Sequence, residues 1–90
     1  MEKRNAKAGS LESSDLLVVI EENKPGEELE IVMHSIVEKQ YGDRIVQIAH
    51  EIATQKGLAN VRILIQDRGA LDYAIRARIE TAMERFERGL

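Results

Sequence analysis

The sequence predicts an α+β fold, a small two-layer sandwich with the element order ββαβα. Two observations lead to it: three short segments of β-branched or alternating apolar residues, and two longer segments whose apolar residues recur at helical spacing. We expect an antiparallel hairpin plus a third strand in one sheet, with the two helices on one face. Ninety residues suffice for one such core and are too few for two.

The first two strands are predicted on either side of a turn. Leu16–Ile20 is an uninterrupted aliphatic run between polar clusters, which is typical of a strand. In the segment 23–26, Pro25 sets φ for the first central position of a type II turn, and Gly26 supplies the positive φ of the second. Apolar residues alternate over 29–33 and predict a second strand with one buried face. We expect these two strands to form the hairpin.

The first helix is predicted from a stripe of apolar residues after residue 35. Ser35 and Glu38 have capping-box spacing, so they mark the start of the helix. Gly57 follows as a stop signal. The stripe repeats at intervals of 4, 4, 3 and 4 residues and consists of Val37, Tyr41, Ile45, Ile48 and Ile52.

The third strand and the second helix complete the predicted fold. Val61–Ile65 is rich in β-branched residues and indicates a strand, and residues 67–69 turn the chain. Asp72 in the first turn and Arg85 and Arg88 in the last turns suit the helix dipole. The stripe of this helix is Leu71, Ile75, Ile79, Ala82 or Met83, and Phe86.

Residues 1–7 are polar and have no apolar periodicity, so we expect a mobile N-terminal leader before one folded domain over residues 8–90. Residues 8–12 are compatible with a short edge strand. No apolar segment follows the N-terminal Met-Glu-Lys-Arg, and the longest apolar run is five residues, so neither a secretory signal nor a membrane span is expected. We expect a cytoplasmic protein.

The composition excludes several classes of chemistry. Cysteine is absent, which excludes disulfides, thiolate metal sites and a thiol nucleophile of the protein itself. His34 and His50 are not connected by any metal-ligand spacing. Ser13 has no histidine in sequence reach that would make it a hydrolase nucleophile. From the residues alone, Ser13 and Ser14 are turn residues, and we expect no catalytic and no metal-binding residue.

The charge distribution is uneven. The formal net charge is −3 and only three residues are aromatic, which argues against a nucleic-acid partner. Four of the eight arginines nevertheless lie within residues 76–88, and we interpret them as a solvated helix face. The alternative is a small split-βαβ interaction or RNA-binding module. Its electrostatic surface would consist of Arg62, Arg68, Arg76 and Arg78.

Three segments carry a resemblance to a known family. They are Ala8–Asp15, Val37–Asp43, and Gly69–Asp72 with the Arg-Ala-Arg that follows at 76–78. Together they resemble the acyl carrier (gamma) subunit of citrate lyase, over roughly residues 8 to 86. The resemblance implies that residues 8–90 are an acyl carrier domain. It also implies a covalently bound 2'-(5''-phosphoribosyl)-3'-dephospho-coenzyme A arm on a serine.

The position of that serine also comes from the resemblance. In the family it follows Gly-x-Leu-Glu, which here is Gly9 to Glu12, so the match places the arm on Ser13. The family usually has glycine after this serine, whereas this chain has Ser14 and thus a second hydroxyl. The resemblance further suggests that Arg76 and Arg78 contact phosphates of the arm or a partner subunit. The other interpretation of Arg76 is an intrahelical pair with Glu80.

The resemblance implies a carrier that is not itself an enzyme. Its arm would hold acetyl and citryl groups as thioesters. The implied partners are the alpha (transferase) and beta (lyase) subunits of citrate lyase and a prosthetic-group transferase, with no nucleic acid and no membrane. A carrier subunit of a malonate decarboxylase-type complex, which uses the same kind of arm, is the alternative within this class.

Overall fold

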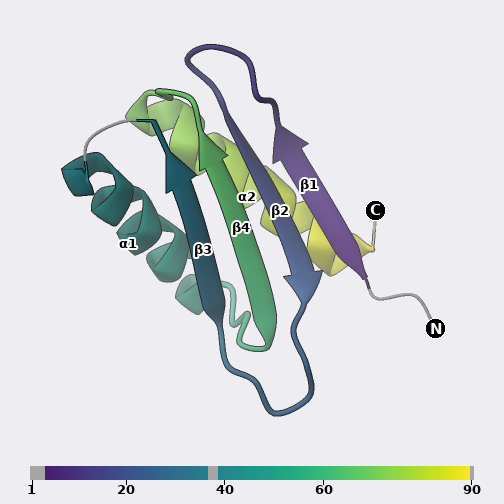
Figure 1. Cartoon of the computed structure of the whole chain (residues 1–90). Helices are drawn as coiled ribbons and strands as arrows, with labels where there is room; N and C mark the ends of the chain where they lie inside the picture. Colours follow the sequence, from purple (N-terminus) through teal and green to yellow (C-terminus); the bar gives the residue numbers. More distant parts are fainter. Residues whose placement is uncertain (1–3, 37–38, 90) are drawn as a thin grey trace.

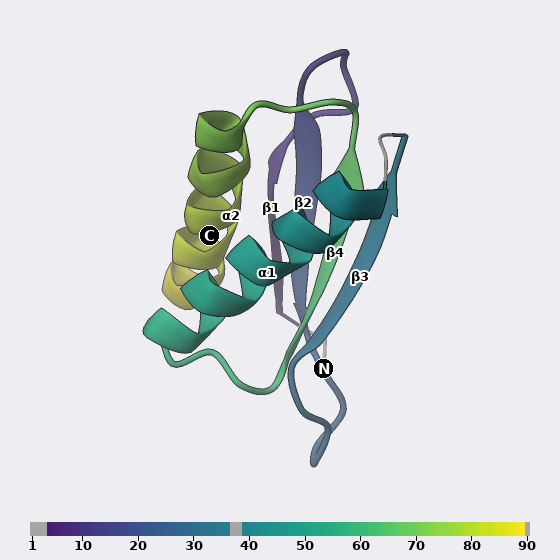
Figure 2. The ribbon, with the colours of Figure 1, turned by 90° about the vertical axis from the view of Figure 1, so that its left-hand side faces the viewer.

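The computed structural model describes residues 4–36 and 39–89. It contains one four-stranded sheet with both helices on the same face (Figures 1 and 2). The α+β class and the placement of the helices are therefore confirmed. The elements are β1 (Asn5–Gly9), β2 (Leu16–Glu22), β3 (Glu30–Ser35), α1 (Lys39–Gln55), β4 (Val61–Asp67) and α2 (Asp72–Arg88).

The order of the strands differs from the expected hairpin. The sheet has the order β1-β2-β4-β3, in which β2 is antiparallel to β1 and β4, and β3 is parallel to β4. The predicted pairing of β2 with β3 is wrong, because β4 lies between them. The long connection over residues 23–29 leaves room for this insertion, and α1 supplies the crossover that the parallel strands β3 and β4 require.

The turn between β2 and β3 is nevertheless present. The Glu27 N–H donates to the Lys24 carbonyl oxygen at 2.9 Å, and Gly26 has φ 86°. Pro25 and Gly26 thus occupy the central positions of a turn that needs a positive φ at the second one. The turn directs the chain across the end of the sheet without making its flanking strands neighbours.

The N-terminal strand corrects the expected leader. Asn5–Gly9 form β1, so the boundary expected after residue 7 falls inside a strand. Ala6 and Ala8 are buried, and β1 packs against α2. Alanine has a low strand propensity and a small side chain, so the alternation of Ala6 and Ala8 with polar residues predicts a strand only weakly. Of the expected edge strand over residues 8–12, only residues 8 and 9 belong to β1.

The core lies between the sheet and the helices. The predicted stripes of the helices are confirmed, except that Tyr41 and Leu71 are exposed and that Val37 lies outside the described residues. No helix in the described part of the chain is long and apolar enough to cross a membrane. The largest fully buried side chains are Leu16, Val18, Ile20, Ile45, Ile48, Ile63, Ile65, Ile75, Ile79, Met83 and Phe86.

The helix ends follow the expected signals in part. Gly57 has φ 70°, and the Leu58 N–H donates to the Ala53 carbonyl oxygen at 2.9 Å, which closes α1 with a Schellman motif. The stop signal at Gly57 is therefore confirmed. The expected capping box includes Glu38, which lies outside the described residues. Its other member, Ser35, is the last residue of β3.

Candidate functional site

Ser13 lies in the short loop between β1 and β2. This loop projects beyond the end of the sheet at which β4 ends and α2 begins (Figure 1). The side chains of Ser13 and Ser14 are both exposed. The structure therefore presents two neighbouring hydroxyls at one end of the molecule, and the backbone conformation of the loop distinguishes them.

Ser13 and Ser14 are the central residues of a tight turn. The Asp15 N–H donates to the Glu12 carbonyl oxygen at 3.2 Å, which closes the four-residue turn Glu12–Asp15. Ser14 has φ 64° and is the single non-glycine residue with positive φ in the described ranges. A turn with positive φ at its second central position favours glycine there, because an L side chain is strained in this conformation.

Ser14 is also the first residue of a β-bulge. Its N–H donates to the Arg68 carbonyl oxygen at 2.9 Å, and the Arg68 N–H donates to the Asp15 carbonyl oxygen at 2.9 Å. Arg68 therefore lies opposite two residues of the loop. In this type of bulge the first residue is usually a left-handed glycine. The turn and the bulge place the same requirement on position 14, which gives a physical reason for the glycine that the family usually has there.

Asp15 anchors the loop through its carboxylate. Oδ2 accepts from the Ser10 hydroxyl at 2.7 Å, and Oδ1 accepts from the Leu16 N–H at 2.7 Å. Arg78 of α2 donates to both oxygens, from Nε at 3.0 Å and from Nη2 at 2.9 Å. The hydrogen bonds from Arg78 and Ser10 lower the pKa of Asp15 from 3.8 to about 2. Asp15 is therefore a carboxylate at neutral pH.

Gly9 allows the chain to enter this loop. It has φ 92°, and a Cβ added there would collide with the Leu16 carbonyl oxygen. That oxygen also accepts from the Ser10 N–H at 3.2 Å. The glycine of the Gly-x-Leu-Glu pattern is thus required by the close approach of two backbone segments, whatever chemistry the loop performs.

The two arginines of the Arg-Ala-Arg segment have different surroundings. Residues two apart on a helix point about 200° apart, so Arg76 and Arg78 cannot face the same loop. Arg78 is engaged by Asp15, a role that the sequence analysis did not foresee. Arg76 is exposed, and within residues 4–36 and 39–89 it forms no ion pair, so the intrahelical pair with Glu80 is not observed.

The four arginines of the alternative nucleic-acid surface do not form one cluster. Arg62 follows the buried Val61 and precedes the buried Ile63 on β4, so its side chain lies on the face of the sheet away from the core. It pairs with Glu21 and Glu30. Arg78 is on α2, which packs on the opposite face of the sheet (Figure 2). Two of the four proposed cations are therefore neutralised and separated by the sheet.

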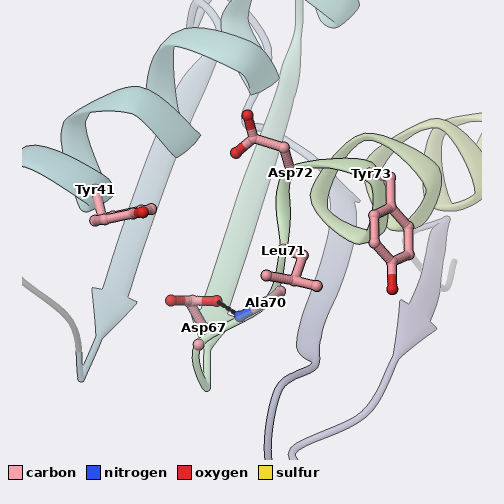
Figure 3. A pocket seen from close by; sticks show the side chains of 7 residues that line it. Tyr41, Asp67, Ala70, Leu71, Asp72 and Tyr73 are labelled. Carbon is pink, nitrogen blue, oxygen red and sulfur yellow. Dashed lines mark hydrogen bonds between the residues drawn. The ribbon is translucent and has the colours of Figure 1, made fainter.

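A cavity of about 600 Å³ lies at the same end of the sheet as the Ser13 loop, between the start of α1 and the β4–α2 connection (Figure 3). Asp67, one of its lining residues, is buried. Its carboxylate accepts from the Ala70 N–H at 3.0 Å and from the Ser35 hydroxyl at 3.1 Å. The cavity is lined by Tyr41, Asp67, Gly69, Ala70, Leu71, Asp72 and Tyr73.

Large apolar side chains are exposed around this cavity and the Ser13 loop. In the described part of the chain there are five of them, between 47% and 74% exposed. One is in the Ser13 loop, one follows β3, one is in the first turn of α1, and two are at the start of α2. All five therefore lie at one end of the molecule, which we call the Ser13 end. They are Leu11, Ile36, Tyr41, Leu71 and Tyr73.

The histidines take no part in this arrangement. His34 and His50 are exposed on β3 and α1. Among the residues that the structure describes, no group of three or more His, Asp or Glu side chains could hold a metal ion. The chemistry that the Ser13 end offers is that of an accessible hydroxyl on a well-anchored turn.

Comparison with known proteins gives one consistent family. The family model described as malonate decarboxylase delta subunit (MdcD) matches residues 3–86. A protein of Halothermothrix orenii named citrate lyase acyl carrier protein is 45% identical over 97% of this chain and 90% of its own length. A protein of the same name from an Enterobacter species is 48% identical over 91% of this chain and 82% of its own length. Another, from Treponema denticola, is 40% identical over 92% of this chain and 92% of its own length. The chain belongs to the family of the citrate lyase acyl carrier proteins.

Proposed function

We propose that this chain is the acyl carrier subunit of a citrate lyase complex and that the arm is attached to Ser13. The observation that carries the assignment of the residue is the turn at Glu12–Asp15. It leaves Ser13 at an exposed corner, whereas Ser14 occupies the left-handed position at which both the turn and the bulge favour glycine. Ser14 thus fills a backbone role that needs no hydroxyl.

The residues present fit a covalent 2'-(5''-phosphoribosyl)-3'-dephospho-coenzyme A arm. The Ser13 hydroxyl accepts and donates no hydrogen bond within residues 4–36 and 39–89, and its side chain faces open solvent. The chain has no cysteine, so it offers no thiol of its own to compete for an acyl group. When bound, the arm supplies the thiol that holds the acyl group.

The protein's own contribution is to position the attachment point. Asp15, Arg78 and the bulge opposite Arg68 fix the base of the loop on α2 and β4. A tether on a rigid turn confines the reactive group to a small volume around the carrier, which converts encounters between separate molecules into intramolecular ones. In the described part of the chain, no histidine or carboxylate is hydrogen-bonded to the Ser13 hydroxyl. We therefore infer that Ser13 is not itself a catalytic nucleophile.

The Ser13 end is the surface that we assign to the partner subunits. Ser13 must enter the active site of the prosthetic-group transferase, and its arm must reach those of the alpha (transferase) and beta (lyase) subunits. The residues around it therefore meet those proteins first. Exposed apolar side chains gathered in one patch are typical of protein–protein contacts. The complex would operate in the cytoplasm, which cell fractionation tests.

Mass spectrometry tests the attachment directly. Co-expression with the prosthetic-group transferase should raise the intact mass of the wild-type protein by the mass of one arm. Ser13→Ala should abolish the increase, whereas Ser14→Ala should retain it. An increase that persists in Ser13→Ala and disappears in Ser14→Ala would move the attachment to Ser14.

The second candidate within the class is a carrier of malonate decarboxylase, which the description of the family model favours. The modified protein should restore citrate cleavage to a complex of the alpha and beta subunits of citrate lyase. Restoration of malonate decarboxylation, and not of citrate cleavage, would favour the alternative.

A further inference from the structure

Arg68 lies directly beside the turn that carries Ser13. Its backbone N–H and carbonyl oxygen are both bonded to the loop, to Asp15 and Ser14 respectively, at 2.9 Å. Paired residues of an antiparallel ladder have Cα atoms about 5.5 Å apart, and Ser13 is one step of about 3.8 Å beyond Ser14. The long side chain of Arg68 therefore starts close enough for its guanidinium to reach a group bound to Ser13.

The charge of Arg68 is not compensated by an acidic partner. Its side chain is exposed and forms no ion pair within residues 4–36 and 39–89. Arg78, the other arginine near the loop, already donates from Nε and Nη2 to the carboxylate of Asp15, which compensates its charge. Arg68 is thus the arginine adjacent to Ser13 whose charge remains available to a new anion.

Attachment of the arm creates such an anion. A phosphodiester on the Ser13 oxygen carries one negative charge and lies next to the exposed carboxylate of Glu12 in the same turn. A guanidinium can donate two parallel hydrogen bonds to two oxygens of one phosphate, which makes arginine well suited to this group.

We propose that Arg68 binds the phosphodiester through which the arm is joined to Ser13. This inference rests on the proposed function and adds a binding residue for the first phosphate of the arm. The contact restrains the base of the arm, while the remainder of the arm stays free to move between partner subunits.

Arg76 provides the matched control. It is exposed and unpaired with acidic side chains in the described residues, as Arg68 is, so its replacement by glutamine removes the same charge. Arg76 lies on α2, on a side of the helix about 200° away from Arg78, which contacts the loop. The contact with the arm or a partner subunit that the resemblance suggests for Arg76 therefore does not involve the phosphodiester on Ser13. A general effect of net charge would appear in both variants, and a contact with the phosphate only in Arg68→Gln.

The test compares the modified forms of wild type, Arg68→Gln, Arg68→Lys and Arg76→Gln, each with its added mass verified. The readout is the ³¹P transverse relaxation rate of the phosphodiester resonance, which reports fast local motion of the phosphorus. In Arg68→Gln we expect the rate to fall by about twofold because the phosphate moves more freely. Arg68→Lys should retain most of the restraint, and Arg76→Gln should match wild type. Raising the salt to about 0.5 M should shift wild type toward Arg68→Gln.

The outcomes separate this inference from the proposed function. If the proteins gain the mass of the arm but Arg68→Gln and Arg76→Gln have the same relaxation rate as wild type, Arg68 does not hold the phosphate. If Ser13 gains no mass at all, the attachment at Ser13 is wrong and the inference is overturned with it.

Discussion

Arg78 on α2 forms a two-pronged ion pair with Asp15, 63 residues earlier in the chain, with donor–acceptor distances of 3.0 and 2.9 Å. The pair joins the second helix to the loop that presents Ser13. Because two parallel hydrogen bonds fix the relative orientation of the guanidinium and the carboxylate, the pair specifies the geometry of the loop as well as its stability. The first two predictions test this contact.

Asp15→Asn should lower the free energy of unfolding by about 1–2 kcal/mol, because hydrogen bonds to a charged group are lost. The loss is not larger because the partly exposed Arg78 regains some hydration, which offsets part of it. Urea denaturation measures this change. The control is Glu12→Gln, which removes a carboxylate charge from the exposed side of the same turn and should change stability by less than about 0.5 kcal/mol. Equal losses in both variants would mean that the charge of the loop matters and the pair does not.

The same contact predicts a pH dependence. Hydrogen bonds from Arg78 and Ser10 hold the pKa of Asp15 at about 2 in the folded protein, below its usual 3.8. The unfolded chain therefore binds a proton at Asp15 before the folded protein does, and the stability that Asp15 contributes is lost as the pH falls from about 4 to about 2. The difference in unfolding free energy between wild type and Asp15→Asn should shrink over this range. A difference that is as large at pH 2 as at pH 7 would contradict the prediction.

The left-handed conformation of Ser14 predicts a stabilising substitution. Ser14→Gly should raise the free energy of unfolding of the unmodified protein by up to about 1 kcal/mol, because relief of the strained φ exceeds the entropy that glycine costs. Thermal and urea denaturation measure the effect. Ser13→Gly serves as the control and should be neutral or destabilising, since the φ of Ser13 is not positive. A loss of stability in Ser14→Gly would show that the serine side chain itself stabilises the loop.

Gly26 and Gly42 offer a paired test of backbone conformation, because there is open space at the position that a Cβ would occupy on either residue. Gly26 has φ 86° in the turn after β2, and Gly26→Val should destabilise by about 1 kcal/mol or more. Gly42 lies within α1 at an ordinary helical φ, so Gly42→Ala should stabilise by up to about 1 kcal/mol. A Cβ at either position would meet no atom within 4 Å, so the opposite signs would come from the backbone alone. Melting temperatures that move in the same direction would refute this explanation.

Apart from β1, the elements of this fold could be predicted from local patterns, but their arrangement could not. The aliphatic run of β2, the β-branched residues of β4 and the stripe through Ile75 and Ile79 are local patterns that the sequence carries directly. The turn at Pro25 and Gly26 shows where the chain reverses, but not which strand then becomes the neighbour. Insertion of β4 beside β2 depends on pairing between residues far apart in the chain.

The site shows the same limit. Ser13 could be named from the resemblance, and its exposure is as expected for a turn residue. The left-handed φ of Ser14 could not be predicted, because it depends on the bulge opposite Arg68, which lies on a distant segment. The role of Arg78 was missed for a similar reason. Sequence spacing shows that Arg76 and Arg78 lie on one helix, but only the packing of α2 against β1 and β2 shows which of them meets the loop.

The final prediction concerns the surface around the attachment point. Leu71→Ala combined with Tyr73→Ser should raise the concentration of carrier needed for half-maximal citrate turnover by about tenfold or more. Burial of one such side chain against a partner contributes about 1.5–3 kcal/mol. Both side chains are more than half exposed, so the melting temperature of the isolated protein should change little.

The control for this surface is Glu27→Ser with Glu28→Ser, an exposed pair in the connection at the opposite end of the sheet. If the Leu71 and Tyr73 double variant matches this control in the reconstituted complex, the partner subunits do not bind through these two residues.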